Sequence, residues 1–129
     1  MNLLEELKAN NYAIMASNGY FSYENGIKPV ISKINEDKEY FKNLIVADKI
    51  IGKASAMLLV MSGVKEVSCV VLSKAGQKIL EEYNIPYYYE VLTESIINRK
   101  GDDICPMEKT VKEIDDLNDA YIALKEKCN

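Results

Sequence analysis

Residues 44–63 read LIVADKIIGKASAMLLVMSG, and we expect the fold to be organised around this stretch. Residues 44–47 are apolar and suit a short buried strand. From about residue 50 to residue 62 the apolar residues surround most of a helical circumference, which predicts a helix buried on more than one side. Gly63 suits the left-handed position that follows the end of a helix.

The next segments repeat the alternation of strand and helix. The run 67–72, VSCVVL, is rich in β-branched residues without alternation, which is typical of a central parallel strand. A helix at 74–83 and a strand at 87–91 are predicted after it. Two consecutive β-α-β units with right-handed crossovers give three parallel strands.

Two strands upstream, at 12–16 and 20–23, flank Asn18-Gly19, which is a strong hairpin signal. Further helices are predicted at 2–9, at 28–35, after Pro106 and from Asp115-Asp116 to the C-terminus. The sequence therefore predicts one α/β domain over residues 1–129, with three α-β-α layers and a mixed sheet of about five strands.

Composition excludes several classes of protein. The net charge is −4 and Arg99 is the only arginine, which argues against nucleic-acid binding. No apolar stretch is long enough to span a membrane and the N-terminus does not resemble a signal peptide, so we expect a soluble cytoplasmic protein. The chain has no histidine, and its three cysteines are far apart. We therefore expect neither a metal site, nor a cofactor, nor chemistry that depends on histidine.

The segment 47–54, ADKIIGKA, lies between a predicted strand and a predicted helix, as a phosphate-binding loop does. It lacks the first glycine and the final Ser/Thr of that motif. A weaker anion site remains, formed by helix N-terminal amides with Lys49 and Lys53. The alternative is that Asp48 compensates the helix dipole and both lysines are solvated. Gly52 costs ~1 kcal/mol relative to alanine in a first helical turn, which indicates that a ligand or another backbone approaches it closely.

Ser73 and Lys74 begin the next predicted helix. Neighbouring parallel strands end at the same edge of a sheet, so the two helix starts should face one crevice, where ligands prefer to bind in open α/β sheets.

The segment 105–110, CPMEKT, supplies the candidate catalytic groups. A cysteine at a helix start can act as a nucleophile, which makes Cys105 a candidate, and Glu108 could act as an acid or base or bind a ligand hydroxyl. The alternative is a buried thiol, with Glu108 serving as a helix cap. Arg99 could hold a phosphate or carboxylate group, or form a salt bridge.

The stretches ADKIIGKASAMLLV, GVKEV, NIPYYYE, IINR and CPMEKTV resemble a small prokaryotic family, the domain-of-unknown-function 1893 family, across nearly the whole chain. The resemblance implies a cytidine-deaminase-like fold. Zinc deaminases begin their two crossover helices with His/Cys-x-Glu and Pro-Cys-x-x-Cys. Here Lys53-Ala54-Ser55 and the stretch 73–76, SKAG, hold those places, so zinc-dependent deamination is not expected.

The favoured function is binding of a small polar or anionic ligand, with nucleotide-like compounds as one class. Asp48, Lys49, Gly52 and Lys53 would form one wall, residues 73–76 another, and residues 105–108 a lid. Two alternatives stay open. One is a metal-independent enzyme that uses the cysteine or glutamate of this lid with a lysine. The other is an interaction module whose apolar helices form a homo-oligomer.

Overall fold

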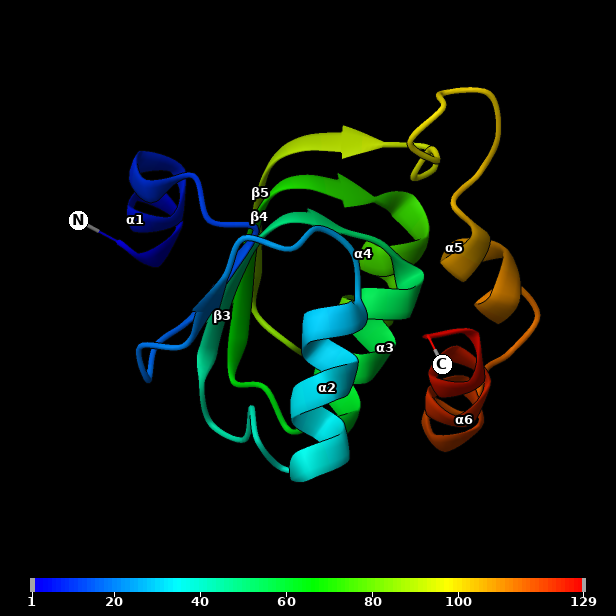
Figure 1. Ribbon diagram of the computed structural model, residues 1–129, viewed down its shortest axis with the longest axis horizontal. Helices are drawn as coiled ribbons and strands as arrows, with labels where there is room; N and C mark the ends of the chain where they lie inside the picture. The colour runs from blue at the N-terminus through cyan, green and yellow to red at the C-terminus, as the bar shows by residue number, and fades with distance from the viewer. Residues whose placement is uncertain (1, 129) are drawn as a thin grey trace.

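A computed structural model describes residues 2–128 and has one five-stranded sheet in the order β2-β1-β3-β4-β5 (Figure 1). The strands are β1 (Ile14–Ala16), β2 (Phe21–Ser22), β3 (Ile45–Ile51), β4 (Glu66–Ser73) and β5 (Tyr87–Thr93). The helices are α1 (Leu3–Asn10), α2 (Lys28–Glu36), α3 (Lys53–Met61), α4 (Lys74–Glu82), α5 (Pro106–Val111) and α6 (Leu117–Cys128).

The strand pairings confirm the predicted mixed sheet. β3, β4 and β5 are parallel, with Val46 opposite Val67 and Val67 opposite Tyr87. β1 is antiparallel to both β2 and β3, with Met15 opposite Phe21 and Ala47. The hairpin thus extends a parallel core of two β-α-β units.

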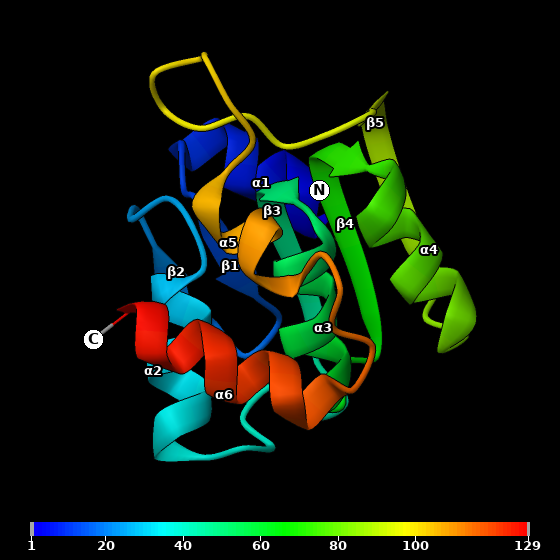
Figure 2. The ribbon, with the colours of Figure 1, turned by 90° about the vertical axis from the view of Figure 1, so that its right-hand side faces the viewer.

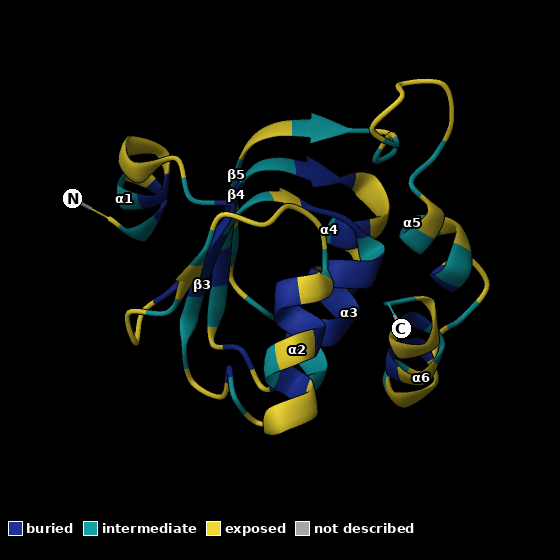
Figure 3. Ribbon diagram, in the orientation of Figure 1, coloured by how far each residue is buried: buried dark blue, intermediate teal, exposed yellow. Residues whose placement is uncertain are grey.

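The layers are unequal. α2, α3, α4, α5 and α6 lie on one side of the sheet, with α6 packed on α3, and α1 alone lies on the other (Figures 1 and 2). Figure 3 shows α3 almost wholly buried in the thicker layer, as its apolar circumference predicted. On the opposite face, Leu4 and Leu7 of α1 pack with Met15 and Ala47. Among the described residues, no helix has the length and apolar character needed to cross a bilayer.

The predicted start of the central helix was wrong. β3 continues to Ile51, which pairs with Leu72, and α3 begins only at Lys53. The parallel ladder with β4 holds these residues in the strand, and Gly52 keeps an extended backbone as the N-cap. Asp48 and its neighbours therefore project from the faces of a strand, and only the residues from Gly52 onward contribute to the helix start.

A buried hydrogen bond at the end of α3 can be compared with an exposed one elsewhere in the fold. The buried Ser62 hydroxyl accepts a hydrogen bond from the Phe41 amide at 3.0 Å, and the exposed Ser17 hydroxyl accepts one from Ile45 at the same distance. Ser62→Ala should lower the free energy of unfolding by about 1–2 kcal/mol, because it leaves a buried amide without a partner. Ser17→Ala should cost less, since water at this exposed position can replace the hydroxyl as the partner of the Ile45 amide. Urea denaturation measures both, and equal losses would contradict the argument.

Candidate functional site

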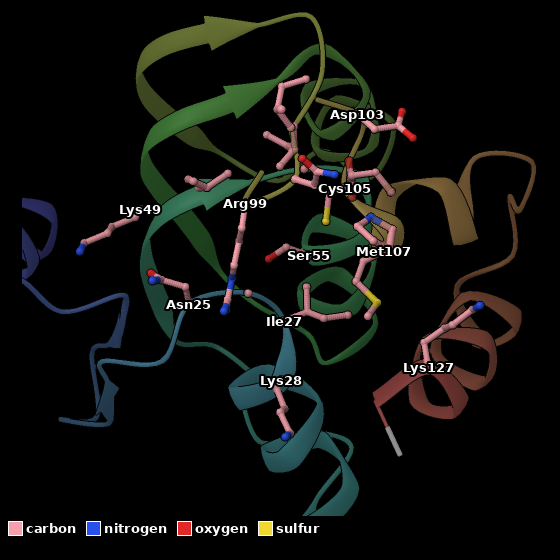
Figure 4. A pocket seen from close by; sticks show the side chains of 18 of the residues that line it. Asn25, Ile27, Lys28, Lys49, Ser55, Arg99, Asp103, Cys105, Met107 and Lys127 are labelled. Atoms are coloured by element: carbon pink, nitrogen blue, oxygen red, sulfur yellow. The ribbon is translucent and has the colours of Figure 1, made fainter. Parts of the chain in front are cut away.

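The main cavity has a volume of about 1120 Å³ and lies where the end of β3 meets α5, the loop before it and the start of α2 (Figure 4). Four segments of the chain contribute to its walls: 24–28, 48–55, 96–108 and 127–128. The residues that matter for the chemistry below are Lys28, Asp48, Ser55, Arg99, Cys105 and Glu108. A cavity of this size can enclose a small molecule.

Glu108 binds the N-terminus of α3. Its Oε1 accepts from the Lys53 amide at 2.7 Å, and its Oε2 accepts from the Ala54 amide at 2.8 Å. The first four amides of a helix have no partner within that helix, and the positive end of the helix dipole favours a carboxylate there. The anion-binding position that the sequence indicated is therefore filled by a side chain of the protein itself, from the adjacent α5 (Figure 2).

Gly52 makes room for this contact. A Cβ atom at this position would lie 2.3 Å from Glu108 Oε1, far inside any normal contact distance. A Cβ atom on Gly76 would in turn lie 3.0 Å from the Gly52 carbonyl group. The close approach predicted at Gly52 is confirmed, and the groups that approach are a carboxylate and the backbone of α4.

Asp48 lies in the middle of the sheet, between Ile14 of β1 and Cys69 of β4, and lines the cavity. Burial raises the pKa of Asp48 to about 8, although the amides of Ile50 and Lys49 donate to the carboxyl group and oppose the rise. The residue remains partly accessible. At neutral pH the carboxyl group is therefore mainly protonated and can donate a hydrogen bond.

The neighbouring thiol is not a reactive group. Burial and the adjacent Asp48 raise the pKa of Cys69 to about 12. The thiolate is the nucleophilic form of cysteine, so Cys69 is inert near neutral pH.

Ser55 was not among the candidate ligands predicted from the sequence. Its side chain is only 5% exposed, and its Oγ is the one buried side-chain N or O atom in residues 2–128 without a hydrogen-bond partner. Figure 4 shows the hydroxyl group turned into the cavity. The feature of the sequence that could have identified it is a single serine within a predicted helix that is otherwise apolar and buried.

The four other polar candidates have partners within the protein, and of these only Lys49 also lines the cavity. Lys49 donates to Asn11 Oδ1 at 2.8 Å and points away from the cavity centre (Figure 4). Lys53 donates from its ammonium group to the Lys112 carbonyl at 3.1 Å.

At the second helix start, Ser73 accepts from the Gly76 amide at 3.0 Å and Lys74 pairs with Glu94. Neither residue lines the cavity, which includes the start of α3 but not that of α4. The two helix starts therefore do not share this cavity, because α5 and the loop before it close over the first one.

Arg99 and Cys105 do line the cavity with Glu108 and Asp48. Arg99 is exposed, and Figure 4 shows its side chain extending across the cavity towards the start of α2. Cys105 is half-buried immediately before α5. Within residues 2–128, no three Cys, Asp or Glu side chains are grouped so that they could hold a metal ion.

Comparisons with known proteins agree with this architecture. The model of a family described as "Domain of unknown function (DUF1893)" matches residues 2–128. The chain is similar to a crystal structure of a DUF1893 family protein from Thermotoga maritima, with 26% sequence identity and a TM-score of 0.87. That match covers 96% of this chain and 86% of the other. A search of curated proteins gave no match.

Proposed function

The chain belongs to the DUF1893 family, whose function is unknown, and we propose from the site itself that the protein binds a small polar molecule in the cavity. The observation that carries this proposal is the Ser55 hydroxyl, which is buried, unpaired and turned into the cavity. A buried hydroxyl without a partner costs about 1–3 kcal/mol. A bound ligand with a polar group at this point would remove that cost.

The groups around Ser55 support a polar ligand over an apolar one. Asp48 offers a protonated carboxyl group in the same cavity, and Arg99 offers five N–H donors. Nucleotide-like compounds remain one class of candidate, as do sugars and their derivatives. The expected cytoplasmic location and the cytidine-deaminase-like assignment stay predictions.

Ser55→Ala tests the proposal, with opposite effects expected on the free and bound protein. The free variant should be as stable as the wild type or slightly more stable, because it loses an unpaired buried hydroxyl. Any compound that raises the melting temperature of the wild type should stabilise the variant less. Native mass spectrometry of the purified protein and a thermal-shift panel of polar metabolites provide the measurements.

Ser17→Ala is the matched control, because it removes an exposed hydroxyl that lies just after β1 and outside the cavity. The proposal fails if no retained molecule and no compound in the panel is detected. It also fails if Ser55→Ala binds as well as the wild type and Ser17→Ala do.

A second candidate function is supported by the position of Cys105 on the cavity wall. A metal-independent enzyme could use its thiol as a nucleophile on the bound molecule. Glu108 is less available for such a role, because both carboxylate oxygens are bound to amides of α3. Rapid alkylation of Cys105 at neutral pH, slowed by a bound compound, would favour the enzyme, and slow alkylation would favour simple binding.

A further inference from the structure

The start of α2 opens on the same cavity and is not compensated by the protein. Its N-cap residue, Ile27, makes no side-chain cap, and its first turn contains no acidic residue. By contrast, Asn2 caps α1, Glu108 binds the start of α3, and Ser73 caps α4. Pro29 in the first turn has no amide N–H, so the Lys28 amide and the positive dipole end of α2 face the cavity through residues 26–28.

Two cations accompany this helix start. Lys28 and Arg99 both line the cavity, and within residues 2–128 neither forms an ion pair, although Lys74 and Lys109 do. Figure 4 shows the Arg99 guanidinium group reaching towards the start of α2, whereas the Lys28 side chain extends from there along the helix, with its ammonium group turned away from Arg99. The two residues come from segments about 70 residues apart in the chain, so only the fold places both on the wall of one cavity.

Acidic groups at the rim do not cancel these charges. Asp103 is paired with Lys109, and Asp102 accepts from the Asn98 amide group at 3.0 Å. Glu24 is the remaining acidic side chain at the rim, and it is exposed to solvent. At the inner end, Glu108 is bound to the helix amides of α3.

The unpaired Ser55 hydroxyl is an independent indication of a ligand in this cavity. It is nine-tenths buried and has no partner in the described chain, yet it is turned towards the space that Arg99 crosses. A molecule with an anionic group at the start of α2 and a hydroxyl-bearing body would reach both features.

We infer that the cavity binds a phosphate monoester of a small hydroxylated molecule, with the phosphate held by Arg99 and the start of α2, where Lys28 adds a second positive charge, and the body hydrogen-bonded to Ser55. A phosphate monoester carries a charge of about −2 at neutral pH. Of the four lining cations without an ion pair or a hydrogen bond within residues 2–128, Lys28 lies at the start of α2 and Arg99 reaches towards it, the other two being Lys100 and Lys127. Arginine and helix N-termini are both suited to phosphate oxygens. This inference rests on the proposed function and moves the anion site from α3, where Glu108 occupies it, to α2.

The test compares D-ribose 5-phosphate, D-ribose and inorganic phosphate as probes of the ¹⁵N-labelled full chain at constant ionic strength. NMR titration should show ribose 5-phosphate binding at least tenfold more tightly than ribose. The shifts should centre on the first turn of α2, Arg99 and Ser55. Arg99→Ala and Lys28→Ala should each weaken binding of ribose 5-phosphate about tenfold, the loss expected for a charge-assisted contact.

Lys74→Ala is the matched control, because it removes an exposed lysine at the start of a different helix, outside the cavity. The inference is overturned if phosphate instead perturbs the amides of Lys53 and Ala54, or if Arg99→Ala binds as tightly as Lys74→Ala. Equal binding of ribose and ribose 5-phosphate would overturn the phosphate assignment and leave the proposed function standing. If no compound in the thermal-shift panel binds, both the inference and the proposed function are overturned.

Discussion

Gly52→Ala should lower the free energy of unfolding by about 2–4 kcal/mol, because the new methyl group and the Glu108 carboxylate cannot occupy the same space. The Cβ atom would lie 2.3 Å from Oε1. Gly52 has an extended backbone, with φ −109° and ψ −169°, so alanine adds no backbone strain. The loss therefore reports the two hydrogen bonds, 2.7 and 2.8 Å long, that the displaced carboxylate gives up.

A double-mutant cycle separates this mechanism from general damage to the core. In a Glu108→Ala background the same Gly52→Ala change should cost less than about 1 kcal/mol, since the space is then free. Urea denaturation of the wild type, both single variants and the double variant gives the coupling. Glu113→Ala, an exposed glutamate just beyond α5, controls for loss of a negative charge. Additive effects of the two substitutions would contradict the argument.

The Glu108 contact also explains how the cavity keeps its shape. α5 has only six residues, and an isolated helix of that length is not stable. The carboxylate ties it to the start of α3, and Val111 is fully buried beneath it. Because Cys105 and the loop carrying Arg99 immediately precede α5, this tie positions both side chains at the cavity.

The parts of the fold that repeat at short range were predictable from the sequence. The β-branched run 67–72 and the apolar circumference of the central helix gave the right elements in the right order. The start of α3 was misplaced because residues 48–51 suit a strand and a helix equally, and only pairing with β4 decides between them. The order of apolar and polar residues in 48–51 does not show whether this segment pairs with β4.

The site was predicted only in part, for a related reason. The close approach to Gly52 follows from a glycine in an apolar segment, but the group that approaches it is separated by more than 50 residues in the chain. The sequence motif indicated Glu108 as a site residue, but it did not predict that the carboxylate binds the amides at the start of α3. Ser55 lay inside the central stretch, yet its missing partner is a property of the assembled core.

Asp48→Asn should raise the free energy of unfolding by about 2–3 kcal/mol at pH 8 and change it little at pH 4. Burial raises the pKa of Asp48 to about 8 in the folded protein, and an aspartate in an unfolded chain has a pKa of about 3.9. Between these values the folded state holds a proton that the unfolded state releases, so stability falls as the pH rises. The full linkage would exceed this figure, and partial access of solvent through the cavity reduces it.

Asparagine removes the titration and preserves the shape of the side chain. Its Oδ1 can still accept from the Ile50 amide, which lies 3.1 Å from Asp48 Oδ1. Urea denaturation at pH 4, 6, 7 and 8 should give curves for the wild type and variant that diverge steadily with pH. Asp115→Asn, at an exposed position before α6, controls for the loss of a carboxyl group at the surface. If Asp48→Asn ran parallel to the wild type, Asp48 would be ionised in the cavity, and a ligand would meet an anion there in place of a hydrogen-bond donor.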